Sequence, residues 1–354
     1  MNKSISTQLL FLMMMFMMMF TSCGKKFKEV GDFKHPDDFY MVIMSDPQLY
    51  WMCEDSSTGC ADVAKNAQNS PNASEEQQGD LSNKWQVQSI NSLIDKYGES
   101  FYSVIINGDL TAYGHESQFN AYYGYYESML KRVVYPGLGN HDYENNANDT
   151  YENHAALRMV KYIRDKSKVL KLKSFDFKEG GVYYNFPSNH KEYRGSMSYS
   201  WEVGKVHFVQ LHNYSGYEKT IEGWDFAEAL KFHIYITNSY EWLDKDLAEA
   251  TKMNKNIILN VHDFQKTYDE KFHKILQKYH SNVKAIYTGH LHGRHGVFYH
   301  IQNIPVYYTG ASSVNSYMLL HFLNGELDDS NLIRSSYGAV KKESYSATSS
   351  QVLE

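Results

Sequence analysis

Two histidines late in the chain have the spacing of a metal-binding pair. His290 and His292 lie in the segment TGHLHGR, directly after the apolar run VKAIY. In an extended strand, residues i and i+2 point to the same side, so both imidazoles would face one way where the strand ends. Imidazole nitrogens bind zinc, iron and other transition metals. The alternative is a pair of surface histidines, because the chain has 16 histidines in all.

Polar side chains follow several other short, β-branched apolar runs in the same way. These runs span 39–48, 102–110, 132–142, 256–263 and 283–290. In α/β sheets, ligands bind where loops converge at the carboxyl ends of the strands. We therefore expect one site built from the polar residues at five strand ends, namely Asp46, Gln48, Asp109, Asn140, His141, His262, His290 and His292.

Helical patterns separate several of these runs. The segment 82–98 has an apolar face, with Ser82 or Asn83 as its N-cap. Strands that alternate with helices predict an α/β fold, and two consecutive strands around a turn predict that its sheets are mixed. The further elements expected are helices at 116–132 and 239–253 and a hairpin at 195–211.

Other stretches lack a clear period. Residues 50–81 are rich in Asn, Ser and Gln and are expected to form a long surface insertion. Residues 143–194 and 214–236 are rich in tyrosine and are expected to be irregular. Long irregular loops in a compact domain are usually functional or disordered, so these loops are candidates for the surround of the site. After residue 325 the sequence becomes polar, which predicts a C-terminal tail at 326–354.

The order of the short motifs resembles that of the calcineurin-like metallophosphoesterase superfamily. The motifs are DPQ (46–48), GD (108–109), GNHD (139–142), NVHD (260–263) and GHLH (289–292). The resemblance extends from about residue 39 to 323. It implies an αββα sandwich of two mixed sheets, with a domain at 38–325 into which 50–81 and 143–194 are inserted.

The resemblance also implies a centre of two divalent metal ions. Asp46, Gln48, Asp109 and His292 would hold the first ion, and Asp109 would bridge to a second ion held by Asn140, His262 and His290. A hydroxide between the ions would attack phosphorus, while His141, oriented by Asp142, would assist the leaving group. The implied activity is hydrolysis of phosphate esters, by a phosphomonoesterase or a phosphodiesterase.

Gln48 departs from the family pattern, which has histidine two residues after the first aspartate. One interpretation is that this ligand is lost; the other is that the amide oxygen binds metal, since it is neutral like imidazole. A harder donor favours Mn, Mg or Fe over Zn. A lost ligand would fit an alternative function, that of a non-catalytic surface lipoprotein which binds a phosphorylated glycan or lipid.

The N-terminus has the features of an export signal. Residues 1–22 combine a basic start with an apolar run, which predicts a signal peptide. The segment FTSC resembles a bacterial lipobox, with Cys23 as the lipidated residue and 23–37 as a tether to the membrane. This predicts an exported, membrane-anchored protein. Cleavage by ordinary signal peptidase and an uncleaved anchor are the alternatives.

Two cysteines remain after Cys23, and they are close in sequence. Cys53 and Cys60 enclose the segment EDSSTG. In an exported protein such a pair predicts a local disulfide that closes a loop. The alternatives are two free thiols or a soft-metal site, although no further cysteine follows to complete such a site.

The charge of the chain bears on its partners. The net charge is −6, and the lysines and arginines form no basic block. Because binding to nucleic acid depends on clustered basic residues, we expect a phosphate-ester substrate and no nucleic-acid partner.

Overall fold

The computed structural model describes residues 26–49, 75–144, 154–184, 189–336, 339–343 and 351–353. The predicted signal peptide, the lipidation site at Cys23 and the cysteines at 53 and 60 lie outside these ranges, as does most of the insertion at 50–81. Within the described ranges, none of the helices combines the length and the apolar composition that crossing a membrane requires.

The first of two large sheets has six strands in the order β17-β16-β15-β1-β2-β3. Its three strands β1, β2 and β3 are parallel, whereas β15 pairs antiparallel with β1. The sheet is therefore mixed, as predicted. The strands are β1 (Asp38–Met44), β2 (Phe101–Ile106), β3 (Val134–Pro136), β15 (Ser316–Leu323), β16 (Glu326–Ser336) and β17 (Ala339–Glu343).

The second large sheet has eight strands in the order β18-β13-β14-β12-β11-β8-β7-β4. Its central strands β8, β11, β12 and β14 are parallel, and β7 and β8 form the predicted hairpin. The strands are β4 (Leu172–Phe175), β7 (Tyr199–Val203), β8 (Val206–Gln210), β11 (Asn256–Val261), β12 (Val283–Thr288), β13 (His295–Ile301), β14 (Ile304–Thr309) and β18 (Gln351–Leu353).

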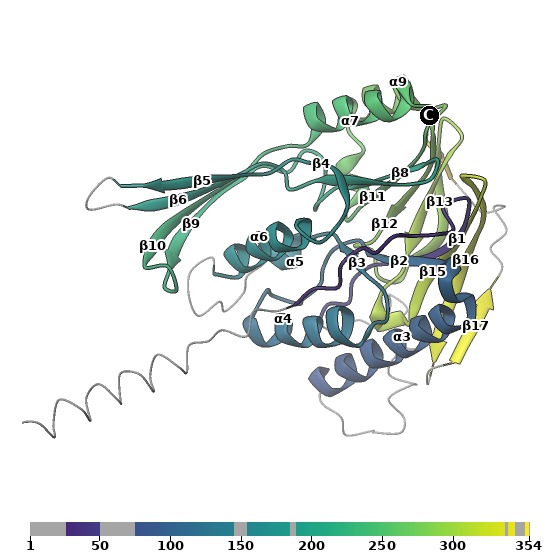
Figure 1. The fold of residues 1–354 in the computed structure, drawn as a ribbon, viewed down its shortest axis with the longest axis horizontal. Coiled ribbons are helices and arrows are strands. Elements are labelled where there is room, and N and C mark those ends of the chain that lie inside the picture. The colour runs from purple at the N-terminus through teal and green to yellow at the C-terminus, as the bar shows by residue number, and fades with distance from the viewer. Residues whose placement is uncertain are drawn as a thin grey trace, which may run out of the picture.

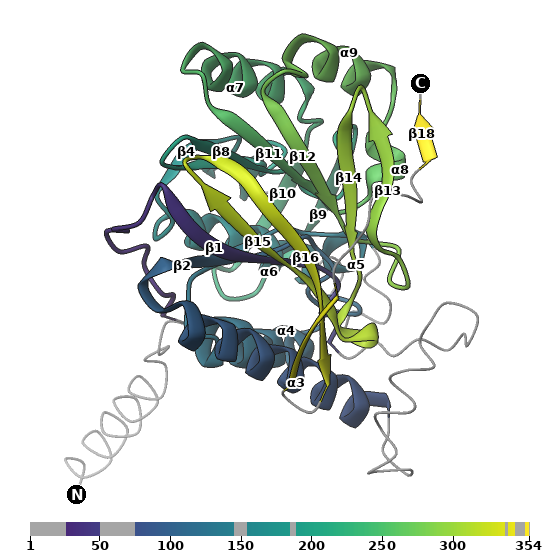
Figure 2. The ribbon, with the colours of Figure 1, turned by 90° about the vertical axis from the view of Figure 1, so that its right-hand side faces the viewer.

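The two sheets pack face to face, and helices cover their outer faces (Figures 1 and 2). Strand β1 illustrates the packing, because Met41 and Ile43 lie in the apolar cluster between the sheets while Val42 and Met44 lie in the cluster beneath the helices. This alternation confirms the αββα sandwich. The helices are α3 (Glu75–Tyr97), α4 (Glu116–Tyr122) with its π-helical continuation (Tyr123–Met129), α7 (Tyr240–Lys252) and α9 (Glu270–Tyr279).

A third, four-stranded sheet extends from one side of the sandwich (Figure 1). It contains β5 (Lys178–Tyr183), β6 (His190–Arg194), β9 (Lys219–Asp225) and β10 (Leu230–Ile236), and α6 (His154–Ser167) packs beneath it. The prediction that 143–194 and 214–236 are irregular is therefore wrong. The buried residues Phe232, Ile234 and Ile236 alternate with Lys231, His233 and Tyr235, and this period of two is a strand signal.

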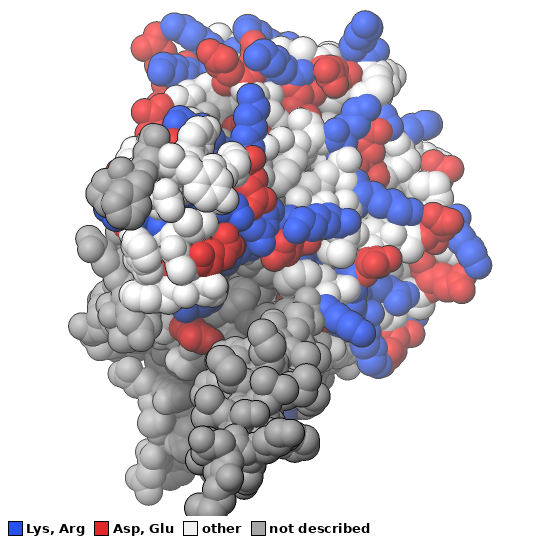
Figure 3. All heavy atoms as spheres, turned by 60° about the vertical axis from the view of Figure 1, so that its left-hand side comes forward, with Lys and Arg blue, Asp and Glu red and all other residues white. Residues whose placement is uncertain are grey.

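Ion pairs join α6 to the extended sheet. Lys161 contacts Asp225 and lies 3.0 Å from Glu228, and Arg164 lies 3.1 Å from Glu179. On this side of the molecule, basic and acidic side chains alternate over the surface (Figure 3). The sheet is thus fixed to the sandwich by burial on one face and by charge pairs at its margin.

Two predicted boundaries differ from the structure. Helix α3 starts at Glu75, so Ser82 and Asn83 are buried inside it rather than capping it. The predicted tail at 326–354 contains β16, which pairs with β15 in the first sheet. The turn at residue 325 therefore joins two paired strands and is not the end of the domain. In both cases, contacts with distant parts of the chain stabilise a helix or a strand in a segment whose local polarity does not predict one.

Candidate metal centre

Four strand ends from both large sheets bring the predicted aspartate and histidine ligands together. Asp46 follows β1, Asp109 follows β2, His262 follows β11, and His290 and His292 follow β12. The contact across the sandwich is direct, because Oδ2 of Asp109 lies 3.2 Å from Nε2 of His262. The two sheets therefore meet at the site through side chains that are far apart in sequence.

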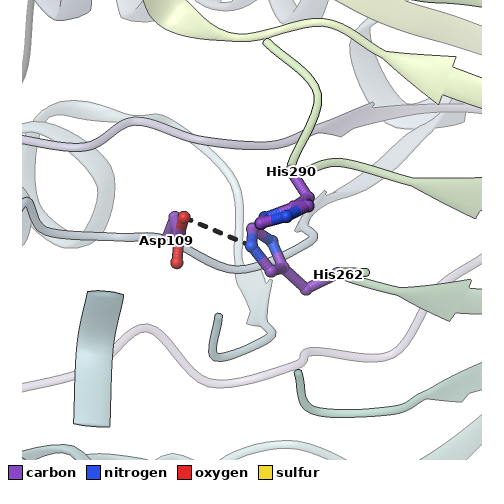
Figure 4. Close-up of side chains that lie close together, drawn as sticks. All are labelled: Asp109, His262 and His290. Atoms are coloured by element: carbon purple, nitrogen blue, oxygen red, sulfur yellow. Dashed lines mark ion pairs between the residues drawn. The ribbon is translucent and has the colours of Figure 1, made fainter. Parts of the chain in front are cut away.

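The carboxylate of Asp109 belongs to two groups of three potential ligands. One group is Asp109, His262 and His290 (Figure 4), and the other is Asp46, Asp109 and His292. Within each group the ligand atoms lie within 4.8 Å of one another, which is the spacing of atoms around one cation. Since a carboxylate has two oxygens, one Asp109 side chain can serve both groups.

Two side-chain amides lie beside these groups. Oδ1 of Asn140, at the start of the short helix α5 (Asn140–Tyr143), is 3.2 Å from Nε2 of His262. Nε2 of Gln48 donates to Oδ2 of Asp109 at 3.2 Å. A half-turn of the Gln48 amide exchanges its nitrogen and oxygen, so the residue is placed either to hold the carboxylate or to present an oxygen to a cation.

The backbone is left-handed at four of the predicted ligands. The φ angles are 52° at Asp46, 36° at Gln48, 50° at Asp109 and 68° at His290. This conformation costs a non-glycine residue on the order of 1–3 kcal/mol where the surroundings enforce it. Backbone hydrogen bonds from Asp46 to Gly108 (3.1 Å) and from Gln48 to Asp109 (2.9 Å) hold two of these turns. The loops are thus constrained where the ligands turn inward.

Two motif glycines leave room for the carboxylates. A Cβ at Gly139 would lie 2.1 Å from Oδ1 of Asp109, and a Cβ at Gly289 would lie 2.6 Å from Oδ2 of Asp46. Neither distance is possible without moving a ligand. The glycine of GNHD is therefore required by the close approach of the backbone to Asp109, and the glycine of GHLH by its approach to Asp46 and to Ser45, whose Oγ would lie 1.8 Å from a Cβ at Gly289.

The buried charges of the centre are strongly coupled. Burial acts to raise the pKa of Asp109, but the charge and hydrogen bond of His262 dominate and hold this pKa well below its usual range. Burial acts to lower the pKa of His262, but the Asp109 carboxylate raises it to about 10. Without a metal the two side chains form an ion pair, so a cation that binds here takes the place of the proton on His262.

Asp46 provides a test of whether the site fits a cation. Its Oδ1 atom is buried without a hydrogen bond from any described residue, although it lies 3.3 Å from Nε2 of His292. Its Oδ2 atom accepts a hydrogen bond from the backbone of His290 at 3.0 Å. A buried carboxylate oxygen without a hydrogen bond is costly, and a bound cation satisfies it. Together with the imidazole and amide donors, this set fits a divalent metal such as Mn, Fe or Zn.

His141 lies beside Asp109, but Asp142 does not hold its ring. The backbone nitrogen of His141 donates to Oδ1 of Asp109 at 2.9 Å, and its Nδ1 lies 2.6 Å from the carbonyl oxygen of Ala112. The buried Asp142 carboxylate instead accepts bonds of 3.0–3.1 Å from Leu110, Thr111 and Gly139. Asp142 thus joins the loops after β2 and β3, and the orienting role expected for it falls to Ala112.

Sequence analysis missed two asparagines that support the ligands. Asn83 of α3 donates to the carbonyl oxygen of Pro47 at 2.9 Å and thereby fixes the loop between Asp46 and Gln48. The carbonyl oxygen of Asn107 lies 2.8 Å from Nδ1 of His262. Asn107 directly precedes the GD motif, which is a usable signal, whereas no local pattern links α3 to the first motif.

Comparison with known proteins identifies a family and a set of similar solved structures. The family model of calcineurin-like phosphoesterases matches residues 42–294. A purple acid phosphatase from yellow lupin (Lupinus luteus) seeds is 15% identical in sequence, with a TM-score of 0.45. The match covers 86% of this chain and 53% of the phosphatase chain. The sulfate thiohydrolase SoxB of Thermus thermophilus, in complex with glycerol, is 10% identical in sequence, with a TM-score of 0.45. The match covers 88% of this chain and 59% of the SoxB chain. The chain thus spans less than two thirds of either protein. No curated protein sequence matches it.

The clash at Gly139 yields a prediction for Gly139→Ala. The new methyl group would displace the Asp109 carboxylate, so we expect the affinity for Mn²⁺ to fall at least tenfold, by titration of the metal-stripped protein. Gly124→Ala is the matched control, because a Cβ at Gly124 meets no atom within 4 Å. Equal affinities in the two variants would contradict the role assigned to Gly139.

Proposed function

The chain belongs to the calcineurin-like phosphoesterase family, and we propose that it hydrolyses phosphate esters at a dinuclear centre whose two ions share Asp109. The family makes it a metal-dependent hydrolase of phosphoric ester bonds. The observation that carries the finer proposal is that the two groups of ligands have Asp109 in common.

The proposed ligands divide into two sets. Asp46, Gln48, Asp109 and His292 would hold one ion, and Asp109, Asn140, His262 and His290 would hold the other. Divalent ions supply Lewis acidity, which neutralises phosphate oxygens and activates water. Since the aspartates contribute two negative charges against four positive ones, the loaded centre attracts a phosphate group and stabilises the charge that develops on it.

Donors are present at every predicted ligand position. The seven side chains of the two proposed sets all carry an oxygen or a nitrogen, and none is replaced by an apolar residue. The alternative of a non-catalytic lipoprotein that binds a phosphorylated glycan or lipid would be marked by missing ligands. Gln48 replaces the histidine of the family pattern but keeps an oxygen donor, so no position of the set lacks a donor, which favours catalysis, of phosphomonoesters or phosphodiesters.

His141 is the residue best placed to serve the leaving group. Its ring is held by the Ala112 carbonyl, which can only accept a hydrogen bond, so Nδ1 carries a proton. Donation to the departing oxygen would then use Nε2, the other ring nitrogen, which carries a proton when both ring nitrogens are protonated. Such assistance contributes about 10²–10⁴-fold to the rate.

His141→Ala separates this role from metal binding. We expect the variant to keep its metal content, because His141 is not among the proposed ligands. Turnover of an alkyl phosphate should fall by roughly 10²-fold or more, whereas nitrophenyl phosphate and bis-nitrophenyl phosphate, whose leaving group needs little protonation, should lose much less.

The comparison of leaving groups decides the outcome. Equal losses on alkyl and nitrophenyl esters would remove His141 from the protonation step. A parallel loss of metal would instead place it in the metal-binding set. If the wild-type protein, fully loaded with metal, hydrolysed neither class of ester, the catalytic proposal itself would be wrong.

Gln48 is tested by two substitutions and a control. If its amide oxygen binds the first ion, Gln48→Ala should lower the affinity for one ion roughly tenfold or more, while Gln48→His should retain activity and shift preference toward Zn. Gln88→Ala is a matched control at an exposed position of α3. Metal titration and turnover that are unchanged in Gln48→Ala would show that the first site does not use this residue.

A further inference from the structure

Asp263 is a buried carboxylate beside the centre that neither group of ligands contains. It follows His262 at the end of β11 and is only 3% exposed. Its Oδ1 accepts a hydrogen bond from the backbone of Lys266 at 3.1 Å and caps the short helix α8 (Phe264–Thr267). Its Oδ2 lies 3.6 Å from Nε2 of His290. The two oxygens therefore meet different partners.

The backbone of His290 is fixed, but its ring needs a further restraint. The backbone nitrogen donates to Asp46, and the residue is held at a φ of 68°. The ring lies edge-on to that of His262, with centroids 5.1 Å apart. Asp263 meets the ring at Nε2, and this contact limits rotation about the side-chain bonds.

We propose that Asp263 is a positioning residue for His290, and this inference rests on the proposed metal centre. Oδ2 of Asp263 would accept a hydrogen bond from Nε2–H of His290, which would leave Nδ1 to face the ion with Asp109 and His262. His262 has the opposite arrangement, because its Nδ1 meets the Asn107 carbonyl while its Nε2 faces Asp109. The two histidines would thus bind through different nitrogens.

Lys266 competes with His290 for the same oxygen of Asp263. Its Nζ also lies 3.6 Å from Oδ2 of Asp263, so the ammonium and the imidazole share one oxygen. If Nδ1 of His290 held a cation, the Nε2 proton would be a stronger hydrogen-bond donor, which would favour the imidazole over Lys266. Carboxylates that hold a ligand histidine in this way contribute about 10–100-fold to metal affinity.

Because Oδ1 caps α8 and Oδ2 faces His290, one substitution can remove the contact with His290 and keep the cap. Serine is as good an N-cap as aspartate, so Asp263→Ser keeps the cap of α8 but is too short to reach His290. Asp269→Ser is the matched control, because Asp269 caps α9 in the same way by accepting from the backbone of Phe272 at 2.9 Å. Lys266→Gln removes the competing ammonium and leaves Asp263 in place.

The experiment is a Mn²⁺ titration of the metal-stripped full chain, with thermal unfolding to verify the fold. Wild type is expected to bind two ions per chain. In Asp263→Ser the affinity for one ion should fall 10–100-fold while the other is unchanged. Asp269→Ser should match wild type, and Lys266→Gln should bind as well as wild type or better.

The outcomes distinguish this inference from the proposed centre. A wild-type protein that binds fewer than two ions refutes the dinuclear centre, and the positioning role with it. Two ions in wild type and unchanged affinities in Asp263→Ser refute the positioning role alone, as does an equal loss at both sites. Should Asp263→Ser fail to fold, Asp263→Asn replaces it: a loss of several-fold at one site supports the role, and no loss overturns it.

Discussion

The arrangement of the site depends on one buried carboxylate, that of Asp109. It is 1% exposed, and removing such a charge from water costs several kcal/mol unless partners compensate it. The compensation comes from both sheets: Gln48 and the backbone of His141 reach it from the first sheet, and His262 reaches it from the second. A site that concentrates negative charge in this way is stable either with a proton on His262 or with a cation in its place.

The sandwich makes this convergence possible. Parallel strands in each sheet end at the same edge, so β1 and β2 deliver Asp46 and Asp109 to the place where β11 and β12 deliver the histidines. The turns that follow are left-handed at four ligands, and Gly139 leaves space for the Asp109 carboxylate. The cost of these conformations is offset by the packed layers around them, since the strands that end at the site run through the apolar clusters on both faces of each sheet.

Sequence predicted the strands that end at the site because their apolar runs and terminal polar residues are local features. It did not predict the four-stranded sheet. In β10 the apolar positions alternate with Lys231, His233 and Tyr235, so the strand contains no continuous apolar run. Nor did the sequence predict that Asp142 accepts hydrogen bonds from Leu110 and Thr111, which lie about thirty residues earlier in the chain and outside the GNHD motif. The order of motifs identifies donors, but only the folded chain shows which donors share a partner.

The sharing of Asp109 is tested most directly by comparing one substitution at two buried aspartates. Asp109→Asn and Asp46→Asn each remove one negative charge with little change in side-chain size. The number of metal ions per chain is then measured after saturation with Mn²⁺. If Asp109 serves both ions and Asp46 only one, wild type should hold two ions, Asp46→Asn about one, and Asp109→Asn close to none. An Asp109→Asn protein that retains one ion, like Asp46→Asn, would contradict the account.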